Sequence, residues 1–124
     1  MSDDLPDYQN VALMRDLPEG RVVTARVAGH LVGVALVGAS PRVFQSLCPH
    51  DKASLKDGRI EGCAVQCPRH FARFDLESGK VSAGWRVDDL RLYPARVQEG
   101  WVQVDAEALR RDPPEGQKKL WDLS

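Results

Sequence analysis

"CPHDKASLKDGRIEGCAVQCPRH", residues 48–70, places two cysteine–histidine pairs in the middle of a chain of 124 residues. Cys48 and His50 form the first pair, Cys67 and His70 form the second, and a proline follows each cysteine. Thiolate sulfur and imidazole nitrogen together suit zinc, copper or the iron of an iron–sulfur cluster. These four residues are therefore the candidate ligands of a metal centre.

The spacing of the two pairs narrows the choice of metal. Structural zinc sites usually pair like with like, cysteine with cysteine and histidine with histidine, on each short loop. Here each loop supplies one sulfur and one nitrogen, and 16 residues separate His50 from Cys67. Two such loops can hold two irons, one bound by both cysteines and the other by both histidines, which is the ligand division of a Rieske [2Fe–2S] centre. A zinc-stapled structural module remains the alternative from another class.

The residues around the pairs resemble the Rieske family. The family pattern C-x-H, then 16 residues, then C-x-x-H is present, and the resemblance extends over residues 11–104. Further matching positions are Leu55, Gly58, Phe74-Asp75 and Gly79. The resemblance implies one [2Fe–2S] cluster held by Cys48, His50, Cys67 and His70, with the cysteines on the buried iron and the histidines on the outer one.

Short β-type runs between turn signals predict an antiparallel all-β fold. Together with the resemblance, they predict a Rieske fold, in which a β-sandwich base carries a small two-loop cluster-binding subdomain. Strands are expected over 11–14, 21–28, 31–37, 42–47, 93–98 and 101–104, with hairpin turns at Gly29-His30 and Glu99-Gly100. A brief helix is expected over 106–111.

The predicted domain organisation has three parts. Residues 1–10 form an N-terminal segment, 11–105 form the Rieske domain, and 106–124 form a C-terminal extension. The cluster-binding part is expected at about 46–84. The family commonly covers the cluster with a proline-containing loop, but residues 82–90 contain no proline, so Trp85 is predicted to supply the cover.

Composition limits the class of partner. The net charge of −1 predicts no broad attraction to nucleic acid or to an anionic membrane. The longest apolar stretch, residues 31–39, has nine residues, far below the roughly 20 that cross a bilayer. An odd count of three cysteines, two of them beside histidines, points to a reducing compartment and hence to the cytoplasm.

Some residues near the motif are interpreted separately. Cys63 alternates with Val65 and Cys67, which predicts a small buried hydrophobic residue rather than a ligand. His30 is expected in a surface turn. Residues 48–74 carry five basic and three acidic side chains, and the positive ones expected beside the cluster are Lys52, Arg69 and Arg73. Together with the histidines, these three are predicted to form the contact surface for redox partners.

The predicted function is single-electron transfer without substrate chemistry, because the resemblance implies irons with no open coordination position. A Rieske oxygenase needs a second iron bound by two histidines and a carboxylate. Only His30 is left after the ligands are assigned. The chain resembles the small ferredoxins of bacterial ring-hydroxylating dioxygenase or related monooxygenase systems, whose partners are a flavin-containing reductase and a terminal oxygenase. The alternative is the small Rieske-like subunit of an assimilatory nitrite reductase.

The resemblance also predicts the redox potential. High-potential Rieske proteins have a disulfide between the two loops, and a serine and a tyrosine that bond to sulfurs. These positions fall on Ala53, Arg69, Ala72 and Phe74, none of which can play those parts. We therefore expect a potential near the lower end of the Rieske range.

Overall fold

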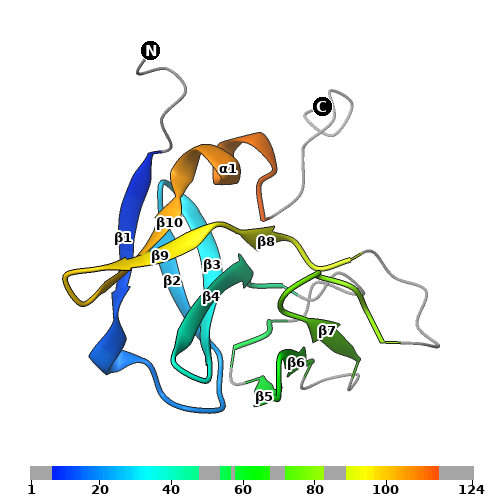
Figure 1. Ribbon diagram of the computed structural model, residues 1–124. Coiled ribbons are helices and arrows are strands. Elements are labelled where there is room, and N and C mark those ends of the chain that lie inside the picture. Colours follow the sequence, from blue (N-terminus) through cyan, green and yellow to red (C-terminus); the bar gives the residue numbers. More distant parts are fainter. Residues whose placement is uncertain (1–6, 48–53, 57, 68–71, 83–88, 115–124) are drawn as a thin grey trace, which may run out of the picture.

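Three antiparallel sheets form the fold (Figure 1). The structure is a computed structural model that describes residues 7–47, 54–56, 58–67, 72–82 and 89–114. The strand orders are β1-β10-β9, β2-β3-β4-β8 and β5-β6-β7. The predicted antiparallel all-β class is confirmed.

The strands are short and are joined mostly by tight turns. Their bounds are β1 Tyr8–Leu13, β2 Val23–Val27, β3 His30–Val37, β4 Ser40–Gln45, β5 Arg59–Glu61, β6 Ala64–Gln66, β7 Arg73–Asp75, β8 Leu92–Tyr93, β9 Ala95–Gln98 and β10 Trp101–Asp105. A single turn of 3-10 helix spans Met14–Asp16, and the α-helix α1 spans Ala106–Arg111.

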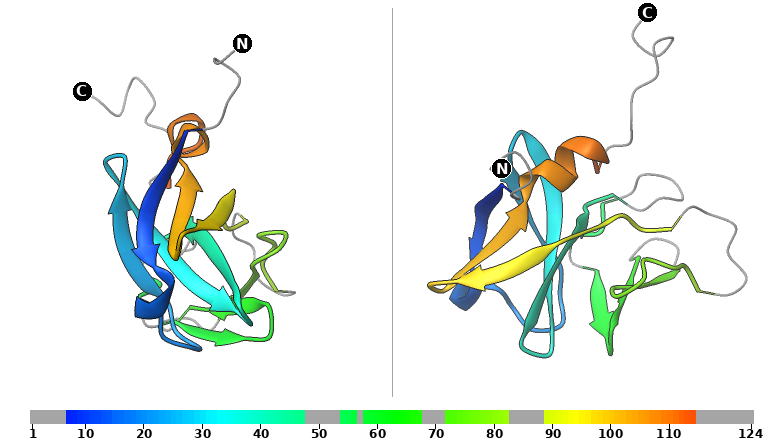
Figure 2. Two further views of the ribbon diagram at one scale, coloured as in Figure 1. Left: turned by 60° about the vertical axis from the view of Figure 1, so that its left-hand side comes forward. Right: turned by 45° about the horizontal axis from the view of Figure 1, so that its top comes forward.

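The four-stranded sheet is the middle layer, with hydrophobic residues buried on both faces (Figure 2). Val32, Val34 and Val43 point into the core shared with the sheet β1-β10-β9. Ala35 and Phe44 point the other way, into the core shared with β5-β6-β7. Burial on both faces accounts for the continuous apolar run in β3. In a strand that is buried on both faces, apolar residues do not have to alternate with polar ones.

The two hydrophobic cores join different pairs of sheets. The base core holds the sandwich together, and its buried members are Leu17, Val27, Val32, Val34, Val43, Tyr93, Val102, Val104 and Leu109. The subdomain core joins the small sheet to the base, and its buried members are Val22, Ala35, Phe44, Leu55, Val65, Cys67, Ala72, Phe74, Leu76 and Leu90. A candidate ligand, Cys67, thus belongs to the subdomain core.

Two hairpin turns test the predicted strand register. The turn at Glu99-Gly100 is confirmed, since Gln98 pairs with Trp101 across it. The turn predicted at Gly29-His30 is wrong by one residue, because Val27 pairs with His30. Ala28 and Gly29 form the turn with φ values of 52° and 83°, the positive pair that a tight type I′ hairpin needs. His30 is therefore the first residue of β3 and is half-buried.

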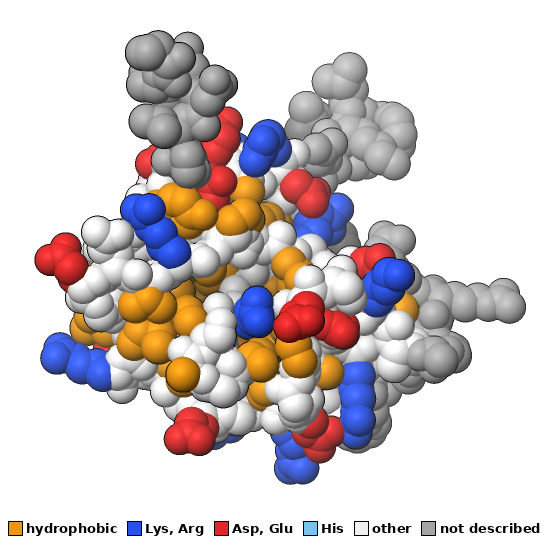
Figure 3. Space-filling model, viewed as in Figure 1, with side chains coloured by type: hydrophobic (Ala, Val, Ile, Leu, Met, Phe, Trp, Pro, Cys, Tyr) orange, Lys and Arg blue, Asp and Glu red, His pale blue; other side chains and the backbone are white. Residues whose placement is uncertain are grey.

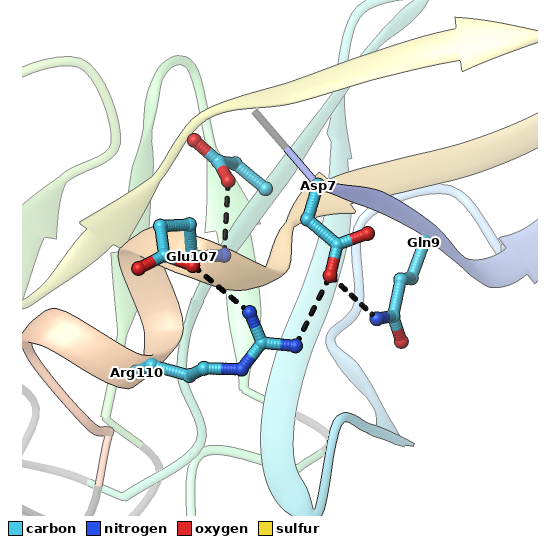
Figure 4. Close-up of polar contacts among 5 residues, drawn as sticks. Asp7, Gln9, Glu107 and Arg110 are labelled. Atoms are coloured by element: carbon cyan, nitrogen blue, oxygen red, sulfur yellow. Dashed lines mark hydrogen bonds and ion pairs between the residues drawn. The ribbon is translucent and has the colours of Figure 1, made fainter. Parts of the chain in front are cut away.

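Helix α1 spans the residues predicted for it and closes one end of the base (Figure 1), and its polar contacts are drawn in Figure 4. Asp105 caps its first turn by accepting a hydrogen bond from the Glu107 backbone N–H at 3.0 Å. Arg110 reaches Asp7 and Glu107, each at 3.0 Å, and so ties the helix to the start of the first strand. The Arg110 guanidinium, with the Gln9 amide, holds the pKa of the Asp7 carboxyl below its ordinary value.

Leu109 makes α1 part of the cooperative fold, because its side chain is fully buried in the base core. We expect Leu109→Ala to lower the free energy of unfolding by about 2–5 kcal/mol, the usual cost of deleting a buried leucine side chain. Urea unfolding followed by far-UV circular dichroism measures the change. Val97→Ala is the matched control, since Val97 is 47% exposed, and its effect should stay within about 0.5 kcal/mol. Equal midpoints for both variants would show that α1 does not unfold with the base.

The edges of the predicted domain stay a prediction, but the structure adds two observations. β1 begins at Tyr8, three residues before the predicted start of the Rieske domain at 11. At the other end, Asp112 accepts hydrogen bonds from Arg91 Nε and from the Tyr93 hydroxyl, both at 2.7 Å. Residues 106–112 of the predicted extension therefore pack on the base. None of the helices that the structure describes has the length and apolarity to span a bilayer.

Candidate metal centre

Cys67 is the candidate ligand that the structure describes. It directly follows β6, and its side chain is fully buried. Its thiol is free, so it is not used in a disulfide. The other three candidates, Cys48, His50 and His70, lie outside the described residues, as do Lys52, Ala53, Arg69 and Trp85. The structure nevertheless describes the residues on both sides of each ligand-bearing loop.

The first loop, residues 48–53, starts and ends at one place in the subdomain. Leu47 and Ser54 form an antiparallel bridge, and the Leu55 N–H donates to the Ser46 carbonyl at 2.8 Å. The Leu55 side chain is fully buried and fixes the return of the chain. Residues Cys48 and His50 thus belong to a short loop closed by paired backbone.

The second loop, residues 68–71, is closed in the same way. The Cys67 N–H donates to the Ala72 carbonyl at 2.8 Å, and the next pair outward is Gln66 with Arg73. The described residues on both sides of 68–71 therefore pair as the two strands of a hairpin, β6 and β7. Ala72, like Cys67, is fully buried, so these two residues shield the base of the loop from solvent.

Gly58 brings the bases of the two loops together. A Cβ atom at this position would lie 2.8 Å from the Leu55 carbonyl oxygen and 2.9 Å from that of Gln66. Only glycine lets the backbone leaving the first loop pass this close to the strand that leads into the second. Leu55 and Cys67 consequently pack in one core.

The turn after β7 explains the matching Phe-Asp-x-x-x-Gly residues. Phe74 is fully buried, while the Asp75 carboxylate accepts the Glu77 N–H at 2.7 Å and so shapes the turn. Gly79 has a φ of +81° and its carbonyl accepts the Leu90 N–H at 2.7 Å. A side chain at Gly79 would collide with the Leu90 carbonyl. The turn therefore holds Leu90, the last residue of the segment 82–90 that is predicted to cover the cluster, against the subdomain.

Gln45 is a positioning residue that the sequence analysis missed. Its side chain is 4% exposed; its amide donates to the Leu47 carbonyl and accepts the Arg91 N–H, each at 2.7 Å. It thus joins the residue before Cys48 to Arg91, which directly follows the predicted cover segment and precedes β8. A polar residue directly after the apolar pair Val43-Phe44, three residues before a candidate ligand, was the available signal.

The predicted positive charge of Arg73 is partly neutralised. Its guanidinium lies 2.6 Å from the Glu61 carboxylate, across the sheet β5-β6-β7. Figure 3 shows basic and acidic side chains side by side along the lower edge, where this sheet lies in Figure 1. Arg73 therefore adds less free positive charge beside the second loop than the sequence predicted.

Donor chemistry and loop geometry both fit a two-iron cluster. The described backbone closes two short loops on one core, and each loop contains one cysteine and one histidine. Such a set can supply two sulfur and two nitrogen ligands to adjacent irons. Buried Cys67 matches the thiolate side of this arrangement, which the resemblance assigns to the inner iron.

Comparison with known proteins identifies the family. The Rieske [2Fe-2S] domain family matches residues 7–94, so the chain belongs to this family. The ferredoxin component of the naphthalene 1,2-dioxygenase/salicylate 5-hydroxylase systems of Ralstonia sp. is 32% identical over 82% of this chain and 97% of its own length. This membership argues against the zinc-stapled module.

Solved structures agree with the family. The ferredoxin of Sphingomonas yanoikuyae B1 is 26% identical and superposes with a TM-score of 0.73 over 80% of this chain and 98% of its own length. A protein from Mycobacterium tuberculosis, provisionally assigned as the small subunit of an NADH-dependent nitrite reductase, is 27% identical. It superposes with a TM-score of 0.72 over 82% of this chain and 96% of its own length. The recognition of a Rieske-type ferredoxin from the sequence is confirmed.

Proposed function

We propose that this chain is the ferredoxin of a multicomponent oxygenase system, carrying single electrons from a flavin-containing reductase to a terminal oxygenase. The observation that carries the proposal is the pair of loops closed on one core, each with one cysteine and one histidine. The relative in Ralstonia sp. supports the oxygenase context, because the match spans 97% of that ferredoxin component.

Cys48, His50, Cys67 and His70 would hold one [2Fe–2S] cluster, which supplies a site for a single electron when bound. The chain's own residues set the surroundings. The subdomain core excludes water from Cys67, which favours a thiolate bound to metal over a solvated one. Gln45 and the Gly79 turn hold the segments that flank the first loop and the predicted cover.

An electron carrier, rather than an oxygenase, agrees with the inventory of histidines. The chain has three, and two are assigned to the cluster. The third, His30, begins β3 on the base. A mononuclear iron site with two histidines and a carboxylate cannot be built from one histidine. The proposal includes a cytoplasmic location, supported by the free thiol of Cys63, and no nucleic-acid or membrane partner.

The small subunit of a nitrite reductase is the second candidate, favoured by the likeness to the protein of Mycobacterium tuberculosis. In that case the chain would serve as a fixed part of an enzyme instead of exchanging between partners. Oxygenase-system ferredoxins and this subunit share the fold, so the fold does not separate them.

Reconstitution tests the proposed function. The loaded protein is mixed with NADH and the flavin-containing reductase of a naphthalene dioxygenase system, and bleaching of its visible absorbance is followed. Addition of the oxidised terminal oxygenase should then restore the absorbance. Failure of both steps, with co-purification of a sirohaem-containing subunit, would replace the proposal by the second candidate.

A further inference from the structure

A row of cross-strand neighbours crosses the outer face of the small sheet. Arg59 pairs with Gln66, and Gln66 pairs with Arg73. On the other side of Arg59, an isolated antiparallel bridge pairs it with Arg21 of the base. Because directly opposite residues point to the same face, the side chains of Arg21, Arg59, Gln66 and Arg73 share one face. We call these four residues the arginine row.

The pair Arg21–Arg59 is electrostatically unfavourable. The hydrogen bonds Val22 N–H to Gly58 carbonyl and Ile60 N–H to Gly20 carbonyl flank it, so it is a non-hydrogen-bonded pair. In such pairs the side chains are closest, and like charges directly opposite are destabilising. Both side chains are exposed.

Counter-charge is sparse along this row. Among the residues that the structure describes, Arg21 and Arg59 form no ion pair, and Arg73 alone in the row has one, with Glu61. The acidic residues of this sheet, Glu61 and Asp75, lie in the neighbouring row on the same face. In that row Glu61 pairs with Ala64, and Ala64 pairs with Asp75. The arginine row is therefore the positive end of this face, and it is the end beside Cys67.

Guanidinium groups on a sheet face are suited to carboxylates, which they bind through two parallel hydrogen bonds. We propose that the arginine row is a docking surface for an acidic patch on the terminal oxygenase, the protein that accepts the electron. The proposal rests on the proposed function. Gln66 precedes Cys67 directly, so a partner on this row lies beside the second ligand loop.

This surface differs from the one predicted from the sequence. That prediction used Lys52, Arg69 and Arg73 near the histidines. Arg21 lies 27 residues before Cys48 in the sequence. It joins the surface only through its bridge to Arg59. Opposite charges on the partner would speed encounter, and this effect falls as salt rises.

The test is a double charge reversal in the full-length loaded protein. Arg21→Glu with Arg59→Glu is compared with Arg15→Glu and Arg26→Glu, which change the net charge equally at exposed base positions. Stopped-flow absorbance gives second-order rate constants for reduction by the reductase and for oxidation by the oxygenase at several salt concentrations. We expect the row variant to slow oxidation by the oxygenase by about tenfold or more at low salt.

Three outcomes decide the proposal. Slowing confined to the row variant, with a weaker salt dependence and unchanged iron content and midpoint potential, supports it. Equal slowing in both double variants shows an effect of net charge alone and overturns it, as does slowing in neither. If the parent protein itself exchanges no electrons with these partners, the proposed function fails instead.

Discussion

Replacing Cys67 by alanine is expected to abolish the [2Fe–2S] cluster, with loss of visible colour and of redox activity. The reason is that the inner iron would keep only one of its two thiolates. Cys67 is fully buried at the end of β6, so no water or neighbouring side chain can easily take its place. Cys48→Ala, His50→Ala and His70→Ala should have the same result.

Cys63→Ala is the matched control, because Cys63 is the other described cysteine and packs against the same core while half-buried. The sequence predicted a buried position, but Cys63 is only half-buried, because it lies in the turn between β5 and β6. Iron and acid-labile sulfide per chain, with far-UV circular dichroism as a check of folding, provide the measurement. A Cys63→Ala protein without iron would show that the cysteines are wrongly assigned.

The second large effect concerns the midpoint potential. Rieske centres span roughly −150 to +300 mV, and we expect this one near the lower end. Ala72 and Phe74 occupy the positions where the resemblance implies a serine and a tyrosine, and both side chains are fully buried. Neither can donate a hydrogen bond to sulfur, so the added negative charge of the reduced state is less stabilised.

The double variant Ala72→Ser with Phe74→Tyr should raise the potential. A hydrogen bond to a charged group contributes about 1.5–3 kcal/mol, and about 60 mV corresponds to a tenfold change for one electron, so a rise on the order of 100 mV is expected. Protein-film voltammetry measures it. Ala64→Ser is the control, since Ala64 pairs with Asp75 on the outer face and should leave the potential unchanged.

A midpoint for the unmodified protein in the upper half of the Rieske span would contradict this reasoning. An unchanged potential in a folded double variant would show that the two positions do not reach the sulfurs. Arg73 is not expected to offset the missing donors, because its side chain is 53% exposed and paired with Glu61.

Local patterns made several features predictable. The Glu99-Gly100 hairpin and the helix over Ala106–Arg111 depend on turn residues and capping within a few positions, and both are confirmed. The turn at Ala28-Gly29 was misplaced by one residue, because an alanine with positive φ carries no sequence signal. Gly29-His30 was predicted instead, because it places glycine at the first position of a two-residue turn.

The ligand set, the family and the all-β class were predictable without the structure, because they depend on local patterns. These patterns are the spacing of cysteine and histidine in short loops and the short β-type runs between turn signals. The tertiary structure alone decided which distant residues become neighbours. Gln45 meets Arg91, Arg73 meets Glu61, and Arg21 meets Arg59 only after the strands pair. Strand pairing fixes which side chains share a face, and no local pattern specifies the partner or register across such separations.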